Sequence, residues 1–180
     1  MVVCRGNNVI LIGLGSNLCG AEFSNPREVL VAALKEMADC GIAVKKLSRF
    51  YESEPVPKSD QPWFVNAVVA VETELSAESL LHKLHEIEAN LGRERRIKWE
   101  ARIIDLDIIG YEKQILPSAA LWPAGPIIIP HPRLHERLFV LYPLRDICPD
   151  WKHPVLDKTA GELIHEVENK TEQGLIRPLD

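Results

Sequence analysis

The chain contains 180 residues, of which 46% are hydrophobic and 26% are charged, and its formal net charge is −5. This length and composition are typical of one folded domain, and they exclude a disordered chain, a collagen-like chain and a coiled coil. The acidic balance argues against general nucleic-acid binding, and no apolar run approaches the ~20 residues of a membrane helix. The four cysteines are scattered without a CxxC pair, so we expect reduced thiols. We therefore expect a single cytoplasmic domain over residues 1–180, with neither nucleic acid nor a membrane as partner.

The beginning of the chain predicts a strand followed by a helix. Residues 9–14 form a continuous apolar run, which is typical of a buried central strand, and a turn is expected at residues 15–17. Pro26 is favoured at the first position of a helix, with either Ser24 or Asn25 as the cap. Apolar residues then recur at helical spacing until Gly41, which predicts the end of the helix.

The middle of the chain predicts three further strands and a second helix. Residues 42–51 and 64–73 are expected to be strands, and three prolines predict a loop at residues 54–62 between them. A helix is expected over residues 76–92, and residues 103–111 form the fourth predicted strand. This order of elements is the βαββαβ core of a ferredoxin-like α+β sandwich, to which the proline-rich C-terminal third adds short helices.

Asp105 and Asp107 stand two residues apart in the fourth predicted strand, so both carboxylates project from the same face. Their mutual repulsion on a half-buried strand is costly, and a divalent cation such as Mg²⁺ would relieve it. A chance acidic pair on a solvated strand is the usual explanation of such a motif. Here, however, a cluster of cations directly precedes the pair. Acids that hold a metal ion, together with arginines that bind phosphate oxygens, form a typical binding site for a polyphosphate. The cluster consists of Arg93, Arg95, Arg96, Lys98 and Arg102.

Other polar and aromatic residues admit both a structural and a functional explanation. His82, His85 and Glu88 follow one another at three-residue spacing, which is typical of a solvated helix face and only weakly indicates zinc. Asn66 interrupts an apolar strand, so its amide either bonds to a neighbouring loop or binds a polar ligand. Residues 131–137 contain two histidines and two arginines and would form a second wall for an anion. Three aromatic residues suit either the core or a stacking surface: Phe64, Trp99 and Phe139.

Five segments carry a more specific pattern. They are GSN (15–17), FYESEPV (50–56), DQPWFVNAV (60–68), GRERRIKWEARIIDLDII (92–109) and PHPRLHERLFVLYPL (130–144). Together they resemble the 6-hydroxymethyl-7,8-dihydropterin pyrophosphokinase family of folate biosynthesis, over residues 9 to 153. The resemblance implies a ferredoxin-like fold and transfer of the pyrophosphoryl group of ATP to the pterin hydroxymethyl group, giving AMP and the pterin diphosphate. It also implies two Mg²⁺ ions, ATP as co-substrate, and a monomer whose partners are these small molecules.

The same resemblance assigns roles to individual residues. Catalytic roles fall to Arg93, Arg102, Asp105 and Asp107, of which the two aspartates hold the metal ions. The residues expected to contact ATP are His85, Glu88, Arg93, Lys98, Trp99, Arg102, Ile108, His131 and Arg137. The residues expected to bind the pterin are Ser53, Val56, Phe64, Asn66, Trp99 and Phe139.

Two functions of other classes remain as alternatives. A metal-dependent nucleotide-sugar transferase also uses an Asp-x-Asp pair, but it would release no AMP and would need no aromatic slot. A non-catalytic ferredoxin-like ligand-binding domain would leave Asp105 and Asp107 without an explanation.

Overall fold

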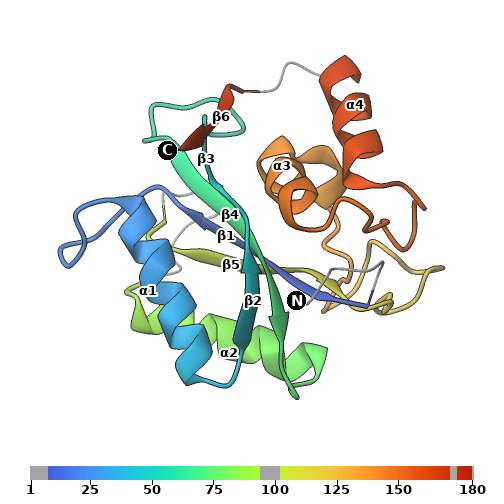
Figure 1. The fold of residues 1–180 in the computed structure, drawn as a ribbon, viewed down its shortest axis with the longest axis horizontal. Coiled ribbons are helices and arrows are strands. Elements are labelled where there is room, and N and C mark those ends of the chain that lie inside the picture. Colours follow the sequence, from blue (N-terminus) through green and yellow to red (C-terminus); the bar gives the residue numbers. More distant parts are fainter. Residues whose placement is uncertain (1–7, 94–101, 171–173, 180) are drawn as a thin grey trace.

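An antiparallel sheet of six strands forms the centre of the structure, a computed structural model that describes residues 8–93, 102–170 and 174–179 (Figure 1). The strands are β1 (Ile10–Ser16), β2 (Ala43–Leu47), β3 (Phe50–Ser53), β4 (Phe64–Glu72), β5 (Asp105–Tyr111) and β6 (Ile176–Leu179). Their order in the sheet is β5-β1-β4-β3-β6, and β2 pairs with the end of β4 that β3 leaves open. The centre of the sheet is therefore formed by β1 and β4.

Helices cover both faces of this sheet (Figure 1). They are α1 (Pro26–Asp39), α2 (Ala77–Asn90), the short 3-10 helix η1 (Leu134–Glu136), α3 (Leu138–Ile147) and α4 (Ala160–Lys170). Ile12 and Val69 point into a core with α1 and α2, whereas Leu11 and Val68 point into a second core with α3 and α4. Neighbouring residues of β1 and β4 thus enter opposite cores, which explains why these strands are apolar without interruption.

The predicted ends of the first two helices are confirmed. The side-chain oxygen of Asn25 accepts a hydrogen bond from the amide of Glu28 at 3.1 Å, and Pro26 begins α1. Ser76 caps α2 through Oγ. Gly41 and Gly92 follow the two helices with φ angles of 78° and 86°, which glycine adopts without strain.

The strand predicted over residues 42–51 is two strands, β2 and β3. They are separated at Ser48, whose Oγ accepts a hydrogen bond from the amide of Val68 at 3.0 Å. The Ser48 amide donates to the carbonyl oxygen of the same valine. The Ser48 side chain thus replaces one of the backbone hydrogen bonds that would join a continuous strand to β4. After this interruption, β3 resumes the pairing with β4.

One further expectation about the strands is wrong, and one strand is not predicted at all. The turn expected at residues 15–17 begins later, because Gly15 and Ser16 still pair with β4. The sequence indicates no structure for the segment that forms the C-terminal strand β6, which pairs with β3 at the edge of the sheet. In both places, pairing with a strand far away in sequence decides the local conformation.

The cysteines follow the prediction only in part. Cys19 and Cys40 are free, whereas the buried Cys148 is disulfide-bonded, so the expectation of reduced thiols is wrong for that residue. Separately, the helices within the described ranges are all too short or too polar to cross a membrane.

Candidate active site

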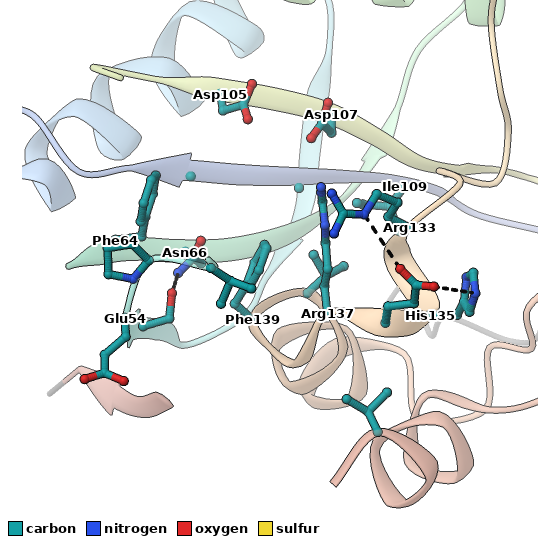
Figure 2. A pocket seen from close by; sticks show the side chains of 18 of the residues that line it. Glu54, Phe64, Asn66, Asp105, Asp107, Ile109, Arg133, His135, Arg137 and Phe139 are labelled. Atoms are coloured by element: carbon teal, nitrogen blue, oxygen red, sulfur yellow. Dashed lines mark hydrogen bonds and ion pairs between the residues drawn. The ribbon is translucent and has the colours of Figure 1, made fainter. Parts of the chain in front are cut away.

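One cavity of about 810 Å³ opens on the face of the sheet that carries η1, α3 and α4. Figure 2 shows β5 and β1 along one side of it and the helices along the other. Gly13 of β1 lies on its floor, and a Cβ there would come within 2.9 Å of Cδ1 of Ile109. Glycine at this position therefore keeps the floor open beside the acidic strand.

The acidic side of the cavity is formed by Asp105 and Asp107 of β5. Leu106 and Ile108 between and after them are buried in the core on the opposite face, as the alternation predicts. Asp105 faces two arginines: Arg93 Nη1 lies 2.7 Å from its Oδ1, and Arg102 Nη1 lies 2.5 Å from its Oδ2. Both oxygens of one carboxylate are thus engaged by cations.

Glu88 supports this arrangement from α2. Its side chain is 2% exposed, and its Oε1 accepts a hydrogen bond from the amide of Leu106 at 2.7 Å. The same oxygen pairs with Nη1 of Arg93. Glu88 therefore fixes Arg93 against the start of β5, although it does not itself line the cavity.

Asp107 experiences a different environment. Partial burial and the negative charge of Asp105 raise the pKa of Asp107 to about 7, against a partial offset from Arg137. Arg137 is itself desolvated, which lowers its pKa, and its guanidinium lies over the Phe139 ring with 5.6 Å between Cζ and the ring centroid. The site thus holds two mutually repelling carboxylates beside a partly buried cation.

His131 lies at the edge of this acidic side, with Nε2 3.9 Å from Oδ2 of Asp107. Burial and the neighbouring Arg137 lower the pKa of His131 to about 4, so the ring is neutral near pH 7. Its Nδ1 accepts a hydrogen bond from the amide of Arg133 at 3.1 Å. The proton of the neutral ring is therefore on Nε2, the nitrogen that faces Asp107.

The donor set suits a hard divalent cation. Two carboxylates on one strand face provide oxygen ligands. The pKa of Asp107 is raised by burial and by the negative charge of Asp105, and a bound cation would favour the charged carboxylate against both effects. Within the described ranges, no group of three or more His, Cys, Asp or Glu residues surrounds a common metal position. Substrate oxygens and water would therefore have to supply the remaining ligands.

The other end of the cavity is aromatic. Figure 2 draws Asn66 between the rings of Phe64 and Phe139, and all three residues line the cavity. The Asn66 amide is 4% exposed, and its Nδ2 donates to Oγ of Ser53 at 2.9 Å. Both explanations left open by the sequence thus apply, because Asn66 bonds to a neighbouring strand and also faces the cavity.

The structure brings many of the predicted site residues together and separates others. Those that line the cavity are Ser53, Val56, Phe64, Asn66, Arg102, Asp105, Asp107, Arg137 and Phe139. Those described residues that do not line it are His85, Glu88, Arg93, Ile108 and His131. Lys98 and Trp99 lie outside the described residues. Arg93 and His131 nevertheless contact the two aspartates, whereas the Ile108 side chain is buried in the core with α1 and α2.

Asn17 does not line the cavity but supports it through Arg102, and the sequence assigns this asparagine no role. It is 2% exposed, and its Oδ1 accepts a hydrogen bond from the amide of Arg102 at 2.8 Å. Its Nδ2 donates to Oε1 of Gln61 and to the carbonyl oxygen of Pro62, both at 3.2 Å. A buried amide directly after an apolar strand is the signal that could have identified it, because such a group needs partners.

The fold and the site define a class of protein: a mixed α/β protein with an antiparallel sheet and a cavity that joins an acid–arginine wall to an aromatic slot. The family model described as 7,8-dihydro-6-hydroxymethylpterin-pyrophosphokinase (HPPK) matches residues 11–149. The chain therefore belongs to the 7,8-dihydro-6-hydroxymethylpterin-pyrophosphokinase family.

Curated relatives support this assignment. The 2-amino-4-hydroxy-6-hydroxymethyldihydropteridine pyrophosphokinase of Bacillus subtilis is 40% identical over 142 residues, which cover 79% of each chain. The Folic acid synthesis protein fol1 of Pneumocystis carinii is 46% identical over 161 residues, but the match spans only 20% of that longer protein.

Among solved structures, the wild-type HPPK-DHPS of Plasmodium falciparum with pteroate matches with a TM-score of 0.68 at 16% identity. The match covers 93% of this chain and 47% of that one. At this identity the likeness supports the fold alone.

Proposed function

We propose that this protein transfers the pyrophosphoryl group of ATP to 6-hydroxymethyl-7,8-dihydropterin, a reaction of folate biosynthesis. The observation that carries the proposal is the cavity in a chain of this family, in which Asp105 and Asp107 face one end and Asn66 lies between two aromatic rings at the other. One end suits a polyphosphate and the other suits a flat, polar heterocycle.

The proposed reaction forms one bond and breaks one. The hydroxymethyl oxygen of the pterin bonds to the β-phosphorus of ATP, and the bond from that phosphorus to the bridging oxygen of the α-phosphate breaks. AMP leaves with the bridging oxygen, and the hydroxyl proton passes to solvent. Such a transfer depends mainly on positioning and charge neutralisation, so a dedicated base is not required.

Asp105 and Asp107 would hold two Mg²⁺ ions, which when bound neutralise charge on the transferred group. Arg93 and Arg102 already point at Asp105, and we assign them to the phosphate oxygens. The partly buried Arg137 adds a third positive charge beside Phe139. Neutral His131 can donate a hydrogen bond from Nε2 without adding charge.

The aromatic end would bind and orient the pterin. Phe64 and Phe139 are assigned to its two faces, and Asn66 to its polar edge. Because Ser53 holds Nδ2 of Asn66, the amide is already oriented before a ligand binds. A prepared slot of this kind lowers the entropy cost of placing the hydroxymethyl group near the β-phosphorus.

Several finer assignments belong to the same proposal. Glu88 would act through Arg93, and Ile108 could offer ATP only its backbone, because its side chain lies in the core. The family resemblance also supports three ATP contacts, by His85, Lys98 and Trp99. It supports two pterin contacts, by Trp99 and Val56.

The fold belongs to the proposal as well. The sheet order β5-β1-β4-β3 supports a ferredoxin-like core. We also propose one domain over residues 1–180, a cytoplasmic location and a monomer.

The test is to incubate the protein with ATP, Mg²⁺ and the pterin alcohol and to follow nucleotides by chromatography. We expect AMP and the pterin diphosphate in equal amounts, and no AMP without the pterin. Release of ADP would contradict the proposal. Binding of the pterin without turnover would favour the non-catalytic alternative, and turnover with a nucleotide sugar would favour the transferase alternative.

A further inference from the structure

The C-terminal strand β6 lies along the outer side of β3, at the edge of the sheet (Figure 1). Four residue pairs join the two strands, from Phe50 with Leu179 to Ser53 with Ile176. The strand lies beyond residue 149, where the match to the family model ends. It contains none of the residues to which a catalytic or binding role is assigned.

The loop that follows β3 forms one wall of the aromatic end of the cavity. Between β3 and β4, the loop of residues 54–63 contributes six residues to the cavity lining: Glu54, Pro55, Val56, Pro57, Ser59 and Gln61. The position of this loop therefore decides the width of the slot in which the heterocycle is proposed to bind.

The first residue of the loop is held directly by the segment before β6. The amide of Glu54 donates to the carbonyl oxygen of Leu175, and the amide of Leu175 donates to Oε2 of Glu54, both at 3.0 Å. Gly174 approaches so closely that a Cβ there would lie 3.0 Å from Cβ of Glu54. Main chain and side chain of Glu54 are thus both fixed by residues 174–175.

Arg177 of β6 connects the two ends of the loop. Its Nε and Nη2 donate to Oε2 of Glu52, just before the loop, at 2.9 and 2.8 Å. Its guanidinium also lies over the ring of Trp63, the last loop residue, with 5.2 Å between Cζ and the ring centroid. One side chain therefore contacts both sides of the loop base.

We propose that β6 positions the pterin-binding loop, with Arg177 and Gly174 as positioning residues that set affinity for the heterocycle but not for ATP. The identity of the heterocycle rests on the proposed function. The Arg177 side chain is 68% exposed, and exposed ion pairs contribute little to global stability. Its loss should therefore loosen the loop without unfolding the protein.

The experiment compares Arg177→Ala, Arg177→Lys and Gly174→Ala with wild type in the full chain. Lys45→Ala removes another exposed ion pair, and Gly161→Ala adds a methyl group whose nearest neighbour is 3.9 Å away, so these two variants serve as matched controls. The readouts are kcat, the KM for each substrate, and hydrogen exchange of the amides at 54–63 without ligand.

We expect Arg177→Ala and Gly174→Ala to raise the pterin KM about three- to tenfold, the usual cost of ordering a loosened loop, with kcat and the ATP KM nearly unchanged. Exchange at 54–63 should accelerate in both variants, Arg177→Lys should be intermediate, and the controls should match wild type. Unchanged pterin KM and exchange, or equal increases in both KM values, would overturn the proposal.

The proposed function and this inference can fail separately. If wild type forms no AMP, the proposed function is wrong, and the exchange measurement alone decides the role of β6. Faster exchange at 54–63 in the two variants would then support positioning of the loop by β6, and unchanged exchange would refute it.

Discussion

Nη1 of Arg102 lies 2.5 Å from Oδ2 of Asp105, three residues further along the chain. The other oxygen of the same carboxylate is paired with Arg93 at 2.7 Å. An acid that is proposed to hold Mg²⁺ is thus neutralised by two guanidinium groups, which are also the groups proposed to bind the phosphates. When ATP and Mg²⁺ bind, Asp105 would pair with the metal ion and the two arginines would pair with the phosphates. These new ion pairs would replace the present ones, so little additional charge would have to lose its solvation.

Replacement of either metal-binding acid is expected to abolish most of the activity. Asp105→Ala and Asp107→Ala should each lower turnover roughly 10³-fold or more, because charge on the transferred group would no longer be neutralised. Circular dichroism should show an intact fold. Asp150→Ala, which changes an exposed acid away from the cavity, is the control. An Asp105→Ala protein with nearly wild-type AMP formation would rule out the metal site.

Arg102 is expected to contribute more to the transition state than to ATP binding. Its backbone amide is held by Asn17, so a side-chain substitution leaves the chain path anchored. Arg102→Ala should lower the single-turnover rate by a factor of ~10³, and its effect on ATP affinity should be far smaller. Arg102→Lys should restore activity only in part, because the planar fork is lost.

Single-turnover rates and equilibrium ATP affinities of these Arg102 variants decide the question together. Equal losses in rate and affinity would mean that Arg102 belongs to a static binding wall, and a specific role in the transition state would then be wrong.

Asp107 should make the metal-free protein less stable as the pH rises. The pKa of its carboxyl is about 7 in the folded protein against 3.8 ordinarily, so between about pH 4 and 7 the folded state keeps a proton that the unfolded state releases. The free energy of unfolding should therefore fall across this range. Asp107→Asn should flatten the profile and melt above wild type at pH 8.

Thermal melts of both proteins from pH 4 to 8 in chelator provide the measurement, with Asp150→Asn as the control. Added Mg²⁺ should stabilise wild type at pH 8 more than it stabilises Asp107→Asn. Parallel pH profiles of wild type and Asp107→Asn would show that burial and Asp105 do not destabilise the charged form of Asp107.

Asn66 is expected to bind the pterin and not ATP. Asn66→Ala should weaken pterin affinity by roughly 1–3 kcal/mol, because polar groups of the ring would lose their partner in a buried slot. Calorimetry with the pterin and with a non-hydrolysable ATP analogue makes the comparison, and Asn90→Ala on the exposed face of α2 is the control. Similar losses for both ligands would identify Asn66 as a structural residue that only supports β3 through Ser53.

Local signals predicted much of this fold. The caps at Asn25 and Ser76 and the glycines after the helices act within one helical turn, so the sequence alone locates the helix ends, although it leaves Ser24 and Asn25 both open as the first cap. The break at Ser48 and the strand β6 depend on partners far away in sequence, β4 and β3. No local pattern in the four residues of β6 carries that information.

The active site likewise contains features that the local sequence predicts and others that it does not. Asp105 and Asp107 could be placed on one face from alternation, because strand geometry has a period of two. The role of Glu88 could not be predicted in this way. Its buried carboxylate accepts a hydrogen bond from the backbone of β5, and this contact exists only once α2 packs on the sheet. The bonds of Asn17 to two separate segments are equally non-local.

The most direct test of the central claim uses ATP that is radiolabelled at either the β- or the γ-phosphorus, with Mg²⁺ and the pterin alcohol. Transfer of an intact pyrophosphoryl group predicts that both labels appear in the pterin product in equal yield, with unlabelled AMP as the other product. With the Asp105→Ala variant, neither label should reach the pterin product at a rate comparable to that of wild type. Transfer of the γ-label alone, with the β-label left on ADP, would contradict pyrophosphoryl transfer.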